Sequence, residues 1–167
     1  MSMPPSSELC SIRIWLTIFI VGLVLSGVTA FPLVHETAWV AGFLQTHPML
    51  PTGIIAWIDR VHAALADQSV RYPFLAYGTD WLAFAHLVIA ICFLGPLVDP
   101  VRNKWVLQFG VIACISVFAL ALIAGPVRGI PPLWRAIDCS FGVFGAIPLL
   151  LCLRLVSRIE AGKPVPR

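Results

Sequence analysis

The sequence predicts an all-α membrane protein: a four-transmembrane-helix bundle with both termini in the cytoplasm. Three observations support this class. Of the 167 residues, 59% are hydrophobic and 11% are charged, whereas about a quarter of the residues in a soluble domain are charged. The apolar residues fall into four blocks of about twenty residues, the length that crosses a hydrocarbon core of about 30 Å. The basic residues, finally, are unequally shared between the segments that join these blocks.

The four blocks set the expected organisation of the chain. We expect one membrane domain comprising residues 1–167, with spans at approximately 12–34, 80–98, 105–125 and 133–155. The first block imitates a secretory signal, with one Arg before an apolar run, but we expect it to remain as an uncleaved span. The polar residues before it are expected to form a frayed arm.

The second block is expected to begin at Thr79 or Asp80, whose side chains can cap the first turn of a helix. His86 follows about a third of the way into this span. Between Asp80 and Asp99 it is the one histidine, and no Asp, Glu, Lys or Arg accompanies it. An ionisable group at this depth in a membrane is a candidate functional residue.

The distribution of charge predicts the orientation. Seven of the eleven basic residues lie on the N-terminal arm, the connection at 99–104 and the C-terminal tail, while five of the eight acids lie on the opposite side. By the positive-inside rule, both termini and this connection are cytoplasmic. We therefore expect a protein integral to the bacterial inner (plasma) membrane, with membrane lipid and other membrane subunits as partners and no nucleic-acid partner.

The long connection between the first two spans is too apolar for a disordered linker. His47-Pro48 and Leu50-Pro51 interrupt it, and an amphipathic helix is predicted over approximately 52–66. One face of this helix is apolar and comprises Ile54, Ile55, Ile58, Val61 and Leu65. We expect the segment to lie on the outer membrane surface or to fold over the mouth of the bundle.

Small residues at helical spacing predict close contacts between spans. Such residues let two helix backbones approach each other in lipid. They are Gly22, Ser26 and Ala30 in the first span, Gly110 and Cys114 in the third, and Gly142, Gly145 and Ala146 in the fourth. The five cysteines form no CxxC and no metal-ligand spacing, so we interpret them as small apolar residues.

The main functional signal is a set of charged residues that map to the outer end of the bundle. In lipid such groups are costly unless they face inward, form pairs or meet water. A polar pocket would satisfy this requirement, with Glu36, Asp80, His86, Arg128, Arg135 and Asp138 as candidate ligand-binding residues. The alternative is structural: Arg135 forms an ion pair with Asp138 or Asp80 that fixes helix register.

Three functions fit such a pocket. The first is a non-catalytic binding or accessory subunit of a membrane complex. The second is a membrane-embedded enzyme that acts on a lipid or other amphiphile by acid–base chemistry, with Glu36, Asp80 or His86 as proton acceptor and Arg128 or Arg135 holding an anionic head group. No nucleophile elbow or phosphate-binding glycine loop identifies a reaction. Catalytic residues and cofactors are therefore left unassigned.

The third function is a haem-binding or metal-binding redox protein. Its weak candidate ligands are His35, His62 and His86. His86 lies roughly 9 Å below Asp80 along the helix, whereas His35 lies near the surface, so the ligands are not at matched depth. No metal site is therefore predicted. A proton-coupled carrier is disfavoured, because the third span contains no charged residue.

Overall fold

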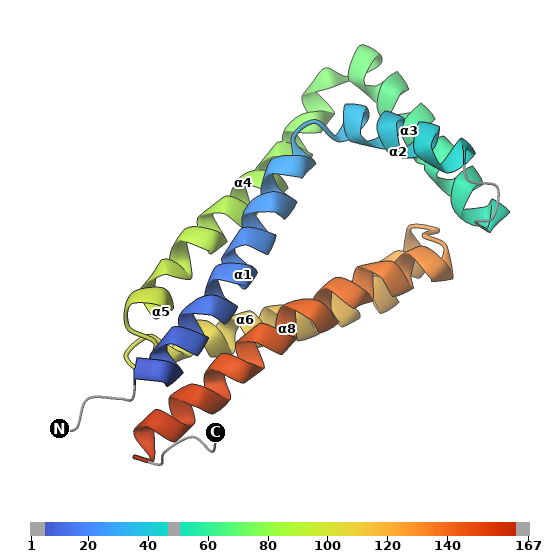
Figure 1. The fold of residues 1–167 in the computed structure, drawn as a ribbon. Helices are drawn as coiled ribbons and strands as arrows, with labels where there is room; N and C mark the ends of the chain where they lie inside the picture. The colour runs from blue at the N-terminus through green and yellow to red at the C-terminus, as the bar shows by residue number, and fades with distance from the viewer. Residues whose placement is uncertain (1–5, 47–50, 163–167) are drawn as a thin grey trace. The chain divides into compact units, whose positions relative to one another are not determined.

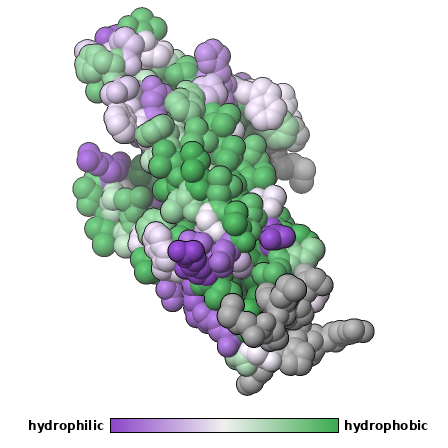
Figure 2. Space-filling view, turned by 90° about the vertical axis from the view of Figure 1, so that its left-hand side faces the viewer, coloured by the Kyte–Doolittle hydropathy of each residue, from purple (hydrophilic) through white to green (hydrophobic). Residues whose placement is uncertain are grey.

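The computed structural model describes residues 6–46 and 51–162, and within these two ranges it contains helices and no strands. Four helical segments are long and apolar enough to cross a membrane: Ser7–Ala30, Pro73–Val98, Lys104–Val127 and Pro132–Glu160 (Figure 1). Figure 2 shows hydrophobic residues over much of one face of the molecule. The predicted all-α class is confirmed for the described residues, and each of the four predicted spans corresponds to a helical segment long and apolar enough to cross a membrane.

The first span ends earlier than predicted. Helix α1 covers Ser6–Ala30, and α2 begins at Leu33 and ends at Gln45. Pro32 separates them because proline has no amide hydrogen and cannot continue the helical ladder. The helix thus begins before and ends before the approximate limits of 12–34 predicted for the span, and His35 and Glu36 lie in the first turn of α2. Part of the predicted frayed arm is helical, and the rest, residues 1–5, lies outside the described residues.

The second span begins before Asp80. It opens with the 3₁₀ turn η1 (Pro73–Leu75), continues as α4 (Ala76–Cys92) and ends as α5 (Leu94–Val98). Pro73 occupies the first position of this segment, where a missing amide hydrogen costs no helical bond. Asp80 lies in the second turn of α4, and the expectation that it caps the span was wrong.

A short turn joins the second span to the third. The Asn103 side-chain amide donates to the carbonyl oxygens of Gly95 (3.2 Å) and Asp99 (2.9 Å), and the Arg102 amide donates to Asp99 Oδ1 at 3.0 Å. The same two carbonyls also accept the backbone amides of Asp99 (2.9 Å) and Asn103 (3.2 Å), so the Asn103 side chain adds a second donor to each and ties the turn to the end of α5.

The third span is built from three consecutive helical segments. Helix α6 (Lys104–Ala119) continues as the π-helical η2 (Leu120–Ala124) and the single turn α7 (Gly125–Val127). The fourth span is α8, Pro132–Glu160. Helix α3, Thr52–Arg71, covers the segment 52–66 for which an amphipathic helix was predicted. The predicted interruption at His47-Pro48 lies outside the described residues.

Contacts divide the chain into two compact units, residues 1–23 with 89–167 and residues 24–88. The core of the first unit consists of eight buried side chains from four segments. They are Ile12 and Leu16 of α1, Phe93 at the α4–α5 junction, Val106 and Leu107 of α6, and Leu149, Cys152 and Val156 of α8.

Helices α6 and α8 approach each other closely in this unit. A Cβ atom added to Gly142 would lie 2.6 Å from the backbone oxygen of Cys114, and one added to Gly110 would lie 2.7 Å from Leu149 Cδ1. The predicted close packing of these spans is therefore confirmed. At one end of the pair, Lys104 Nζ and Glu160 Oε2 form an ion pair of 2.6 Å.

The second unit contains the end of α1, the α2–α3 hairpin and most of α4. Gly27 marks the contact between α1 and α4, because a Cβ there would lie 2.9 Å from the backbone oxygen of Ala83. Helices α2 and α3 pack side by side (Figure 1). Ala41 and Ile58 are 6% and 4% exposed.

Candidate functional site

The six predicted pocket residues divide between the two units. Glu36 in α2 and Asp80 and His86 in α4 belong to residues 24–88. Arg128, Arg135 and Asp138 belong to the other unit, at and just before the start of α8. Each set of three residues has its own surroundings within its unit. That all six residues line one pocket stays a prediction.

Arg135 is the residue whose surroundings are most informative. It lies in the first turn of α8, where its amide donates to the Pro131 carbonyl at 3.0 Å. Its side chain lies over Gly125, and a Cβ at that glycine would collide with Cδ of Arg135. The Nε atom of Arg135 is buried and has no hydrogen-bond partner among the described residues. A buried donor in this state costs about 1–3 kcal/mol, which an incoming acceptor would recover.

The backbone below Arg135 has an unusual form. The π-helical segment Leu120–Ala124 ends at the buried Gly125, and the Ile130 amide donates back to the Gly125 carbonyl at 2.9 Å. Gly129 has φ +68°, a conformation that glycine adopts without strain. Single π-helical turns occur frequently at functional sites. Here the turn places Gly125, which lacks a side chain, beneath the aliphatic part of the Arg135 side chain.

Neither Asp138 nor Arg128 contacts the Arg135 guanidinium through an ion pair or hydrogen bond among those the structure gives for the described residues. Asp138 is half-buried one turn after Arg135, yet no ion pair joins the two side chains. The physical reason is that the Arg135 side chain turns toward Gly125 and away from the i+3 position. Pairing with Asp80, in the other unit, stays a prediction. Arg128 is exposed, and its amide donates to the carbonyls of Ala124 and Gly125.

His86 lies at the contact between α1 and α4. A Cβ added to Gly27 would lie 3.2 Å from the His86 Cβ, and His86 Nδ1 lies 2.8 Å from the Leu82 carbonyl oxygen. Because a carbonyl can only accept, Nδ1 carries the hydrogen in this bond. In the neutral ring, Nε2 is then the acceptor, available to a hydrogen-bond donor.

The weak metal candidates are not assembled into a site. His62 Nδ1 lies 3.3 Å from Thr37 Oγ1, and His35 is exposed on α2. Within residues 6–46 and 51–162, no group of three or more His, Cys, Asp or Glu side chains could hold a metal ion. Among the cysteines, Cys152 is buried in the core and its Sγ contacts the Ile12 carbonyl at 3.7 Å, which agrees with its interpretation as a small apolar residue.

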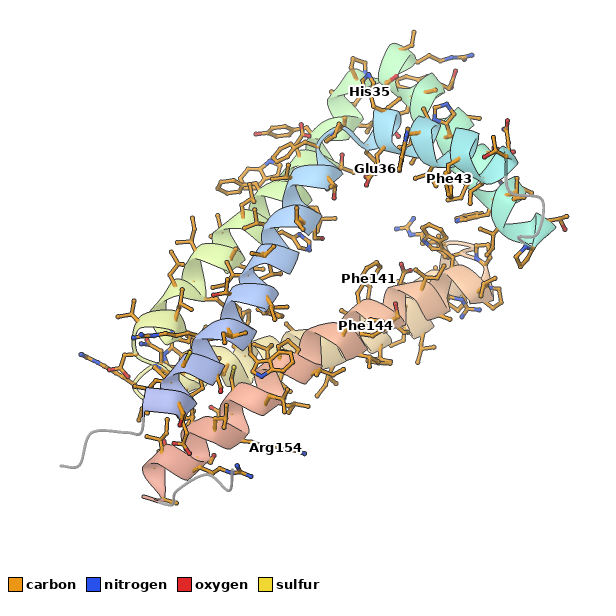
Figure 3. The ribbon with its side chains drawn as sticks, in the orientation of Figure 1. His35, Glu36, Phe43, Phe141, Phe144 and Arg154 are labelled. Carbon is orange, nitrogen blue, oxygen red and sulfur yellow. The ribbon has the colours of Figure 1, made fainter. Side chains whose placement is uncertain are left out.

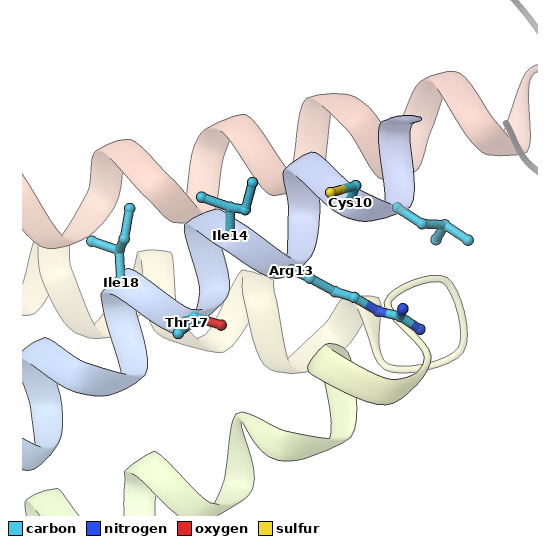
Figure 4. Close-up of a pocket in the computed structure, with 6 residues that line it drawn as sticks. Cys10, Arg13, Ile14, Thr17 and Ile18 are labelled. Carbon is cyan, nitrogen blue, oxygen red and sulfur yellow. The ribbon is translucent and has the colours of Figure 1, made fainter. Parts of the chain in front are cut away.

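Two features of α1 were not found from the sequence. Glu8, in its first turn, is 2% exposed, and neither carboxylate oxygen has a hydrogen-bond partner in the described part of the chain. Its position near a helix N-terminus, where an acid interacts favourably with the helix dipole, was the available signal. A surface pocket of about 470 Å³ lies along the same helix (Figure 4). It is lined by Leu9, Cys10, Arg13, Ile14, Thr17 and Ile18, so one helix supplies the whole lining.

Comparison with known proteins adds no assignment. No protein-family model, curated protein or solved structure matches this chain. The function is therefore argued from the chain's own residues.

Proposed function

We propose that this small integral membrane protein is a non-catalytic binding or accessory subunit of a membrane complex, and that Arg135 contacts the group it binds. The bound group presents an anionic or carbonyl oxygen to the Arg135 guanidinium. The remaining members of the proposed pocket, at the non-cytoplasmic end of the bundle, are Glu36, Asp80, His86, Arg128 and Asp138.

The carrying observation is the buried Nε of Arg135, which lacks a hydrogen-bond partner among the described residues. A guanidinium binds carboxylate or phosphate oxygens through two parallel hydrogen bonds, one of which can come from Nε. An acceptor on the bound group would satisfy this donor. What Arg135 lacks is a hydrogen-bond acceptor. A bound ligand can provide an acceptor without any proton transfer, so the observation favours binding over acid–base catalysis.

The surroundings of Arg135 support an anionic group. Arg128 lies in the four-residue connection from α7 to α8, and Arg135 lies in the first turn of α8. The start of a long helix carries a partial positive charge, which adds to these two cations. One carboxylate, Asp138, lies a turn further along α8. Two cations, one carboxylate and the partial charge of the helix start leave a small net positive charge, which a singly charged oxygen group matches.

The orientation of the site comes from the charge distribution. The N-terminal arm, the 99–104 connection and the C-terminal tail contain most of the basic residues, which favours their cytoplasmic placement. One span, the third, separates the 99–104 connection from the 128–131 connection, which would therefore lie on the opposite side of the membrane. The bound group would accordingly be a lipid head group, another amphiphile or a partner subunit reached from the non-cytoplasmic leaflet.

Native mass spectrometry of protein extracted in mild detergent tests the proposal. The wild type is compared with Arg135→Gln and with Arg154→Gln as a matched control. Arg154 is exposed on the same helix (Figure 3), and its position is roughly 28 Å along the axis from Arg135. We expect a retained lipid, amphiphile or subunit in the wild type and the control and its loss in Arg135→Gln.

The stability of both variants is measured in the same detergent, so that lost binding can be distinguished from unfolding. Arg135→Lys keeps the positive charge but removes Nε, and we expect it to retain less of the bound group than the wild type. Equal retention by the wild type and a folded Arg135→Gln would contradict the proposal.

A further inference from the structure

In the α2–α3 hairpin, the apolar face of α3 packs against α2. Ile58 of α3 is 4% exposed and Ala41 of α2 is 6% exposed. Two polar contacts connect the same pair of helices: Thr37 Oγ1 with His62 Nδ1 at 3.3 Å, and Gln45 Nε2 with Asp59 Oδ1 at 3.4 Å. Helix α2 therefore covers the face of α3 that the sequence pattern offered to a membrane surface.

The large exposed aromatic residues of the hairpin helices lie on α2. Trp39 is 74% exposed and Phe43 is 52% exposed, and their rings stack with centroids 6.2 Å apart. On α3, by contrast, the exposed residues are mostly small or charged, and Val70 near its end is the one large hydrophobic residue exposed. The two helices thus present different chemistry on their outer sides.

Both ends of the hairpin are held beside membrane spans. Two residues separate α1 from α2, and Tyr72 alone separates α3 from η1, where the second span begins. Within residues 24–88, the hairpin runs across the direction of α1 and α4 (Figure 1). Since the spans cross the bilayer, a hairpin oriented in this way lies along the membrane surface.

The aromatic side of α2 is turned toward the lipid in this arrangement. Figure 3 shows Phe43 and Glu36 on the side of α2 toward which the spans extend, and His35 on the other side. Trp39 lies one turn before Phe43 and therefore shares its side of the helix. Glu36 lies at the start of α2, next to the end of the first span, where a carboxylate remains at head-group level.

We propose that α2 is an interfacial anchor, with Trp39 and Phe43 inserted at the boundary between head groups and acyl chains of the leaflet at this end of the spans. Tryptophan is favoured at this depth because its large ring is apolar and its indole N–H can bond to head groups or water. Helix α3 packs against α2, and its exposed residues include the charged Arg60 and Asp67. The partner of this surface is the bilayer that contains the spans.

Fluorescence quenching in lipid nanodiscs tests the anchor. The full chain contains six tryptophans, so the contribution of Trp39 is obtained by difference, from wild type and Trp39→Phe. One series of nanodiscs contains phospholipid brominated near the carbonyl end of the acyl chains, and a second, unbrominated series is titrated with iodide. Because Trp39 is exposed, its replacement by Phe leaves the packing of the chain intact.

Trp57→Phe is the matched control on the same hairpin. Trp57 lies on α3, is half-buried, and its Nε1 is buried without a partner in the described part of the chain. Because its indole N–H is enclosed by protein, we expect neither quencher to reach it. We expect Trp39→Phe to lower the amount of emission that brominated lipid quenches and to leave the amount that iodide quenches unchanged, whereas Trp57→Phe lowers neither amount.

Two results would overturn the proposal. If Trp39→Phe removes iodide-quenched emission and leaves quenching by brominated lipid unchanged, the aromatic side of α2 faces water. If Trp39→Phe changes neither, protein covers this side, either a second copy of the chain or another subunit.

Discussion

Gly142→Ala probes the contact on which the α6–α8 pair depends. The added Cβ would lie 2.6 Å from the backbone oxygen of Cys114 and 3.1 Å from a ring carbon of Phe118. A backbone atom cannot move without displacing its helix, so the substitution overpacks the contact. Overpacking of this kind typically costs about 1–3 kcal/mol.

Two other glycines supply matched controls for the same chemical change. Gly22 in α1 has no neighbour within 4 Å of an added Cβ, so Gly22→Ala gains up to about 1 kcal/mol from lower chain entropy. Gly110→Ala meets the ends of the Leu149 and Phe93 side chains at 2.7 Å. Because side-chain ends can shift, we expect it to be intermediate. The stability of Gly142→Ala should lie about 1–3 kcal/mol below that of Gly22→Ala, a factor of about 5 to 150 in the folding equilibrium.

Equilibrium unfolding in mixed micelles with a rising mole fraction of dodecyl sulfate, followed by tryptophan fluorescence, measures these differences. The order of stability should be Gly22→Ala, then Gly110→Ala, then Gly142→Ala. Equal stability of Gly22→Ala and Gly142→Ala would refute the reasoning, because it would mean that no backbone lies against position 142.

Two further variants probe the polar contacts at the other end of the unit. Asn103→Ala removes the donor to the Gly95 and Asp99 carbonyls. We expect the free energy of unfolding to fall by about 1–2 kcal/mol in the same titration. An unchanged midpoint would show that these bonds do not stabilise the turn. Glu160→Gln breaks the ion pair with Lys104. In this pair the Lys104 side chain is 31% exposed and the Glu160 side chain is 38% exposed. For so exposed a pair we expect a loss below about 1 kcal/mol that diminishes as salt is raised, and a salt-independent loss above 2 kcal/mol would contradict this expectation.

The number of spans was predictable because lipid imposes a single solution on the backbone. Every amide must be bonded within the helix, and a helix must contain about twenty apolar residues to cross the hydrocarbon core. The boundaries were less predictable because prolines decide them. Pro32 ends α1 before the polar residues His35 and Glu36, while Pro73 begins the second span before Asp80. Polarity alone places a boundary at the first charged residue.

Local contacts of the candidate site followed from helix geometry, whereas the position of Arg135 did not. The bond from His86 to the Leu82 carbonyl joins residues four apart, which helical spacing brings together. The same spacing predicted a pair between Arg135 and Asp138. Arg135 instead lies over Gly125, ten residues earlier, because a π-helical segment and a four-residue connection bring that glycine beneath it. No helical periodicity contains this information.

The faces of the helices were the least predictable feature, since lipid removes the contrast between buried and exposed apolar residues. In α3 the pattern identified an apolar face but not its partner, which is α2. In α1 the repeat of Gly22, Ser26 and Ala30 predicted the packed stripe, yet Gly22 has no neighbour and Gly27 lies against the Ala83 backbone. Gly27 differs from Gly22 in having the backbone of another helix beside it. A glycine in a membrane helix therefore marks a contact only where a second backbone reaches it, and that depends on residues in another span.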